Sequence, residues 1–204
     1  MKRKKKKIST RKVSVLRSIK PYWLYLILTF RKTVEVGKSK PNAENWDGRV
    51  FLYCSQDMKS FRRIPKQDQE WMRKYLGKVA CMFTCDHIEE YQQIFIADIK
   101  NSSDEQTIKP LLDASQLTLD ELKDYTTNQG PFDCVYAWHI NGIVQHGYPM
   151  ELNQFRKACD KRKCDGCEFF NEADMSAYEH SYFVTTCVNA ITRPPQTFCY
   201  VMGD

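Results

Sequence analysis

The sequence predicts an α+β fold, in which short strands form a small closed or nearly closed β-barrel with short peripheral helices. Two observations favour this class. Many short segments alternate apolar and polar residues, whereas helical spacing is confined to three or four brief stretches. The chain has 204 residues, of which 42% are hydrophobic and 13% aromatic, enough for one buried core. We therefore expect one domain rather than a string of modules.

Residues 13–40 are the stretch around which we expect the fold to be organised. Val13 and Val15 belong to an alternating run that predicts a strand. Pro21 suits the first position of a helix, where its missing N–H costs nothing. The apolar face of that helix would carry four residues at helical spacing: Trp23, Leu26, Ile27 and Phe30. Residues 33–36 alternate again and predict a second strand.

The rest of the chain continues the mixture of strands and short helices. Its patterns predict, in order, a strand at 49–55, a helix at 67–76, strands at 79–85 and 93–99, a helix at 119–127, a strand at 135–140, a brief helix at 151–157 and a last strand at 197–202. Two local signals stand out. Thr118 and Glu121 have the spacing of a capping box, and Asn141-Gly142 predicts a hairpin turn from 135–140 into 143–147.

Charge is distributed unevenly along the chain. The net charge is +6, but residues 1–12 alone hold eight Lys/Arg and no acid, so the remainder carries 23 basic and 25 acidic residues. Residues 1–12 are expected to be a disordered tail that attracts nucleic-acid phosphate, and 13–204 to be the domain. Within the domain, 13–88 carry a net +7 and 89–125 a net −6. A nucleic-acid surface should therefore come from the first half.

The sequence also bounds the compartment. No stretch approaches the roughly 20 apolar residues of a membrane span, and no apolar signal segment follows the basic N-terminus. We expect a cytoplasmic protein with no membrane partner. The nine cysteines are then expected to be thiols or metal thiolates rather than disulfides.

A cysteine cluster suggests a metal site in a Cys-rich insertion at 156–190. Three of its cysteines lie in the segment CDKRKCDGC, and Cys187 or His180 would supply a fourth ligand; the set we favour is Cys159, Cys164, Cys167 and Cys187. Soft thiolates at this spacing favour structural zinc. An iron–sulfur cluster, a redox pair and free surface thiols are the alternatives. Four other cysteines occupy alternating apolar positions and are expected to fill the core: Cys54, Cys81, Cys85 and Cys134.

Five short segments, in order, resemble the ASCH domain family, in its phage and bacterial form. They are SIKP with the helix and FRKTVEVG that follow it, GRVFLYCS, GKVACMFTCDHIE, YAWHI and RPPQTFCYV. The resemblance runs from Val13 to the C-terminus. It implies a PUA-like barrel topology, which the residue patterns alone do not specify.

The resemblance also bears on enzyme activity. Some members hydrolyse acetylated cytidine with a Gly-x-Lys-x-x-Thr-x-Arg segment, and FRKTVEVG places Lys32 at the Lys, Glu35 at the Thr and Gly37 at the Arg. The hydroxyl is thus replaced by a carboxylate and the guanidinium is absent, although Thr33 offers a hydroxyl two positions earlier. These departures speak against hydrolysis and leave it as an alternative.

The resemblance favours a nucleic-acid-binding protein, with RNA or a modified nucleotide as the partner. The residues expected to bind it are Lys20, Lys32, Lys38 and Lys40 for charge, Glu35 as an acceptor for a base amino group, and Tyr53 for stacking, with Tyr22 and Trp23 as alternatives. A third possibility is a protein adaptor that uses the acidic 89–125 surface. The four histidines are scattered in sequence and are expected to be structural or exposed.

Overall fold

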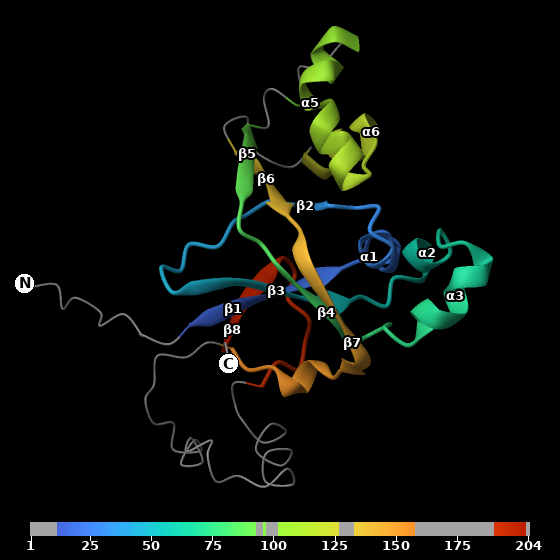
Figure 1. Ribbon diagram of the computed structural model, residues 1–204, viewed down its shortest axis with the longest axis vertical. Helices are drawn as coiled ribbons and strands as arrows, with labels where there is room; N and C mark the ends of the chain where they lie inside the picture. Colours follow the sequence, from blue (N-terminus) through green and yellow to red (C-terminus); the bar gives the residue numbers. More distant parts are fainter. Residues whose placement is uncertain (1–11, 93–95, 97–101, 127–132, 158–189, 203–204) are drawn as a thin grey trace, which may run out of the picture.

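The computed structural model describes residues 12–92, 96, 102–126, 133–157 and 190–202, and these form two β-sheets with helices at their margins (Figure 1). The larger sheet has five strands in the order β7-β4-β3-β1-β8, and the smaller has three in the order β2-β6-β5. Both the mixed α+β class and the abundance of short strands are as the sequence predicts.

The five-stranded sheet is mostly antiparallel. Its central pair, β1 (Val13–Ile19) and β3 (Trp46–Cys54), is parallel, and α1 lies in the connection between them. On the outside, β8 (Phe198–Met202) pairs antiparallel with β1, β4 (Val79–Thr84) with β3, and β7 (Asn141–Met150) with β4. Each predicted strand in this sheet is confirmed within a few residues.

The smaller sheet carries the site described below. Its central strand, β6 (Cys134–His139), pairs antiparallel with β2 (Val34–Gly37) on one side and β5 (Ile88–Gln92) on the other. The strand predicted at 93–99 is not confirmed. Ile96 is helical, and the other residues of this stretch lie outside the described ranges.

A closed barrel, which the sequence favours, is not what the described residues form. The strand order of the larger sheet ends at β7 and β8, and the three other strands make a separate sheet. The predicted hairpin at Asn141-Gly142 is also wrong. Instead of pairing with each other, β6 joins the small sheet and β7 joins the large one, and the Ile140 N–H donates to the Thr33 carbonyl at 2.9 Å. Pairing with distant strands therefore outweighs the local turn signal.

The helices lie in two groups (Figure 1). Beside the large sheet are α1 (Pro21–Leu28), α2 (Met58–Phe61) and α3 (Lys66–Arg73); at the far end of the small sheet are α5 (Ser102–Ser115) and α6 (Leu119–Thr126). A short 3-10 turn at Leu152–Gln154 stands where the brief helix is predicted. Among the described residues, no helix is both long and apolar enough to cross a membrane.

Local signals account for these helices only in part. The capping box is confirmed: the Glu121 N–H donates to Thr118 Oγ1 and the Thr118 N–H to Glu121 Oε2, both at 3.1 Å. Helix α1 begins at Pro21 as predicted, but it buries almost every side and Phe30 is 75% exposed, with φ +57° beyond the helix end. The patterns miss α2, which has only four residues, and α5, which has weak periodicity and contains Pro110.

The main core lies between the large sheet and the first group of helices. It contains the buried thiols Cys54, Cys81 and Cys85, which are free, as expected for core filling; Cys134 is half-buried. Burial raises the pKa of the Cys54 and Cys81 thiols to about 12 and that of Cys85 to about 11, from an ordinary value of 9.0. Folding therefore holds these protons on sulfur in a pH range where the unfolded chain releases them.

These thiols predict alkaline destabilisation. Because their pKa is raised on folding, their contribution is complete below pH 9 and is lost as the pH rises toward 12. Each thiol changes the free energy of unfolding by up to about 1.4 kcal/mol per pH unit in this window. Urea unfolding under reducing conditions should show a falling midpoint above pH 9. The fall should be shallower in Cys81→Ala, and parallel curves for the two proteins would contradict this account.

Candidate functional site

A pocket of about 810 Å³ opens where β1, the start of α1, β2, α2 and α6 converge. This volume lies within the range of sites that hold small molecules. Six basic and four acidic side chains line it. The basic ones are Arg17, Lys20, Lys32, Lys38, Lys59 and Arg63, and the acidic ones are Glu35, Asp57, Glu121 and Asp124. The lining therefore has an excess of positive charge.

The inner wall of the pocket is a buried charge cluster of three side chains, Arg17, Lys32 and Glu35. The Glu35 carboxylate lies between the two cations, with Oε1 3.4 Å from Arg17 Nη2 and Oε2 3.3 Å from Lys32 Nζ. The side chains are only 6%, 2% and 11% exposed for Arg17, Lys32 and Glu35 respectively. Two positive charges thus share one negative charge in a poorly solvated place, where unpaired charge is costly.

Backbone carbonyls complete the bonding of both cations. Arg17 Nη2 donates to the Val36 carbonyl at 2.7 Å, and Lys32 Nζ donates to the Ser115 carbonyl at the last residue of α5, also at 2.7 Å. The helix C-terminus is a favourable place for a cation. Burial lowers the pKa of Lys32, against the opposing effect of Glu35, so its amine gives up a proton more readily than an exposed lysine does.

Two buried polar atoms of the pocket lining have no hydrogen-bond partner among the described residues. They are Arg17 Nε and Ser55 Oγ. Buried donors are nearly always satisfied in folded proteins, by protein, water or ligand. Unpartnered donors in a pocket lining are therefore what a site for a polar ligand would present.

Gly37 makes room for Arg17. A Cβ placed at Gly37 would lie 2.7 Å from Arg17 Nη1, closer than such atoms approach, and 3.1 Å from Trp138 Nε1, which is tighter than most contacts. The guanidinium group of Arg17 also lies over the Trp138 ring, 5.3 Å from its centroid. A guanidinium thus lies 3.4 Å from Glu35, although position 37, where the ASCH resemblance leads one to expect an arginine, is glycine.

Aromatic rings and long basic side chains surround the inner cluster. Lys32 Nζ lies 5.3 Å from the Trp23 ring centroid, Arg63 lies 4.9 Å from the same ring, and Lys38 Nζ lies 4.8 Å from the Tyr125 ring. Tyr125 is 37% exposed. The pocket therefore combines ring faces with positive charge.

The structure brings together most, though not all, of the binding residues predicted from sequence. Lys20, Lys32, Glu35 and Lys38 line the pocket. Lys40 does not: it pairs with Glu90 and lies over Tyr136, so the expectation that all these lysines face one cleft is wrong for Lys40. Tyr53 is buried in a different apolar cluster with Leu16 and Val79, and it offers the pocket no ring face.

Sequence reasoning missed Arg17. Within β1 it follows Val13 and Val15 in the alternating pattern, at a position where an apolar residue is expected, and an arginine there is the available signal. It also missed a second cluster: His87, Glu89 and His139 come together on the small sheet, although the histidines appear scattered in sequence. The predicted zinc ligands Cys159, Cys164, Cys167 and Cys187 all lie outside the described residues.

The fold and pocket define a mixed α+β protein with a buried Arg–Glu–Lys cluster, and comparison with known structures gives the fold a name. One mutant of the ASCH protein from Zymomonas mobilis matches with a TM-score of 0.50 and 14% identity, covering 94% of this chain and 89% of that one. The unmutated protein matches at 0.49 and 12%, covering 93% and 87%. No family model matches the sequence, and no curated protein does. The chain has an ASCH fold.

The packing of Arg17 over Gly37 predicts the effect of a single methyl group. Gly37→Ala should displace the Arg17 guanidinium from Glu35 and destabilise the protein by about 1–3 kcal/mol, a typical cost of overpacking. The matched control is Gly147→Ala, because a Cβ at Gly147 meets no atom within 4 Å. Urea unfolding of both variants measures the difference, and equal stability of the two would refute the steric argument.

Proposed function

We propose that the pocket binds one nucleotide unit of RNA, or a modified nucleotide. The observation that carries the proposal is the buried Arg17–Glu35–Lys32 cluster, with Arg17 Nε and Ser55 Oγ left unpartnered in the lining. These donors call for a polar ligand, and the excess of basic residues in the lining calls for an anionic one.

Recognition of the base is assigned to Glu35 and a ring. The distances from Glu35 to its two cations, 3.4 and 3.3 Å, exceed the roughly 2.7–2.9 Å of a strong charge-assisted hydrogen bond. The carboxylate therefore retains capacity to accept from a base amino group, as carboxylates do with cytosine. Tyr125, at the rim, offers the face on which a base would stack.

The phosphate is assigned to the lysines nearer the surface. Lys20 is 65% exposed and its nearest carboxylate oxygen, on Asp57, is 3.8 Å away, so its charge is only weakly compensated. Lys38 lies over Tyr125 and close to the proposed base position. The basic tail at 1–12 would add affinity for phosphate without selecting a base.

Binding of a fluorescent single-stranded RNA to the full-length chain across a salt series tests this proposal. Lys38→Ala should weaken binding and reduce the slope of log affinity against log salt by about 0.7, the value for one phosphate contact to a single strand. Lys40→Ala removes the same charge two residues away, outside the pocket, and should change binding little. Equal effects of the two substitutions would indicate general attraction rather than the pocket.

Stacking is tested separately at Tyr125. Tyr125→Ala should cost about 1–3 kcal/mol of binding free energy, whereas Tyr125→Phe keeps the ring and should bind nearly as the parent does. Residues 13–204 without the tail serve as a further comparison. If all RNA affinity disappears with the tail, the pocket does not bind RNA.

One observation favours a second candidate, hydrolysis of an amide on a modified nucleoside. Lys32 is buried, its pKa is lowered by burial, and its amine lies 3.3 Å from the Glu35 carboxylate. A neutral amine or the carboxylate would be able to take a proton from an attacking water. Arg17, beside Glu35, would supply the charge stabilisation expected from the arginine of the ASCH hydrolases.

Turnover of N-acetylated cytidine separates the two candidates. Hydrolysis that is abolished in Lys32→Ala and retained in Lys40→Ala would establish an enzyme. RNA binding without any turnover of the nucleoside by the parent protein would leave the binding function alone.

A zinc site at Cys159, Cys164, Cys167 and Cys187 also remains a proposal, supported by sequence spacing. About one zinc per chain should be present in purified protein, and chelation should lower the melting temperature if the metal organises this segment. Metal-free protein with an unchanged melting temperature would contradict it.

A further inference from the structure

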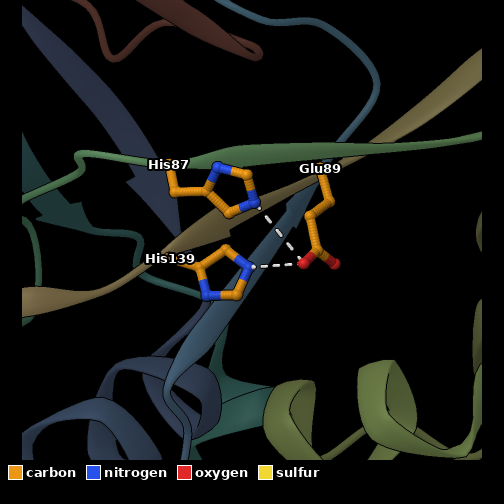
Figure 2. Close-up of side chains that lie close together, drawn as sticks. All are labelled: His87, Glu89 and His139. Atoms are coloured by element: carbon orange, nitrogen blue, oxygen red, sulfur yellow. Dashed lines mark ion pairs between the residues drawn. The ribbon is translucent and has the colours of Figure 1, made fainter.

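Three side chains with metal-binding atoms, those of His87, Glu89 and His139, meet on the small sheet (Figure 2). Both imidazole Nε2 atoms point toward the same carboxylate oxygen, and each lies 3.5 Å from Glu89 Oε1. All the potential ligand atoms lie within 4.8 Å of one another. None of these residues lines the pocket described above.

The pairing of β5 with β6 explains why the three meet. His87 and Glu89 are two residues apart and therefore share one face of an extended chain. The register pairs Ile88 with Trp138, which places His87 opposite His139, and the His139 N–H donates to the His87 carbonyl at 3.1 Å. The backbone thus fixes the two rings side by side, with centroids 4.9 Å apart.

This cluster and the pocket use opposite faces of the small sheet. Glu35 pairs with Trp138, so both side chains lie on the pocket face. Neighbouring residues alternate, and Glu89 pairs with Ala137, so Glu89 lies on the other face, together with His139. The cluster is therefore a separate site.

The distances suit a shared ion better than direct contacts. A good hydrogen bond between a charged imidazole and a carboxylate is about 2.7–2.9 Å long. Two ligands of a tetrahedral zinc, each bonded at about 2.0–2.1 Å, are instead about 3.3–3.4 Å apart. The observed separation of 3.5 Å between each Nε2 and Glu89 Oε1 is close to that edge.

The surroundings orient the proposed ligands. The Tyr91 hydroxyl donates to Glu89 Oε2 at 2.6 Å, which holds the carboxylate and leaves Oε1 toward the histidines. Carboxylates that bind metals are typically held by a hydrogen bond of this kind. The proposed ligand atom His139 Nε2 is buried and has no hydrogen-bond partner among the described residues.

We propose that His87, Glu89 and His139 bind one Zn²⁺ ion, independently of the pocket and of the cysteines. Two imidazoles and one carboxylate are a donor set that zinc accepts, whereas Ca²⁺ and Mg²⁺ prefer oxygen alone. Three protein ligands leave a fourth position for water. The ion would link β5 to the end of β6, where the chain crosses into the large sheet.

Zinc titration of the full-length chain tests the site, after Cys159, Cys164, Cys167 and Cys187 are replaced by serine to remove thiolate binding. We expect one zinc per chain by calorimetry. The zinc affinity should fall roughly tenfold or more in each of three variants, Glu89→Gln, His87→Ala and His139→Ala. Glu90→Gln is the matched control, because it makes the same charge change on the opposite face of β5 and should leave zinc affinity unchanged.

Two results would overturn the proposal. One is a serine variant that folds but binds no zinc, and the other is equal zinc affinity in Glu89→Gln and Glu90→Gln. If the serine variant does not fold, the same pair of glutamate variants is compared with the cysteines intact. Zinc should then shift the imidazole NMR resonances of His87 and His139 in Glu90→Gln, and the same shift in Glu89→Gln should need roughly tenfold more zinc. Unshifted resonances in Glu90→Gln would equally exclude the site.

Discussion

The buried ionic contact of Glu35 with Arg17 and Lys32 is the constraint on which the pocket region depends. It ties together β1, β2 and, through the Ser115 carbonyl, the end of α5. Because two cations share one carboxylate away from solvent, each must keep its carbonyl partner to avoid a large desolvation cost. This requirement explains why Gly37 lacks a side chain: the guanidinium needs the space above it.

The small sheet separates two kinds of chemistry because side chains alternate across it. The pocket face presents Glu35 and Trp138 next to Arg17, and basic residues outnumber acidic ones in the pocket lining. On the other face, two histidines and Glu89 lie together beside an apolar cluster formed with α5 and α6. A strand residue can serve one face without disturbing the other, so a protein of this size can support two independent sites.

The pocket differs in both its residues and its charge from what the ASCH resemblance suggests. Glu35 takes the place of a hydroxyl, and a guanidinium is present although position 37 is glycine, because Arg17 reaches it from β1. The lowered pKa of Lys32 is compatible with proton transfer. The ion pair between Lys32 and Glu35 is equally compatible with a role in ligand binding alone. The two proposed functions thus share these three residues, and the binding function also depends on Tyr125, Lys20 and Lys38.

The sequence by itself determined the elements whose signals are local. Alternation defines β1, β3, β4, β6 and β8, Pro21 starts α1, and Thr118 with Glu121 starts α6, because each depends on neighbours a few residues away. Only the tertiary structure decided the rest. Strand pairing places β6 and β7 in different sheets, and it places Arg17 beside Glu35. Lys40 pairs with Glu90 and lies outside the pocket. The register between β5 and β6 places His87 next to His139. These are contacts between distant segments, which chain patterns do not encode.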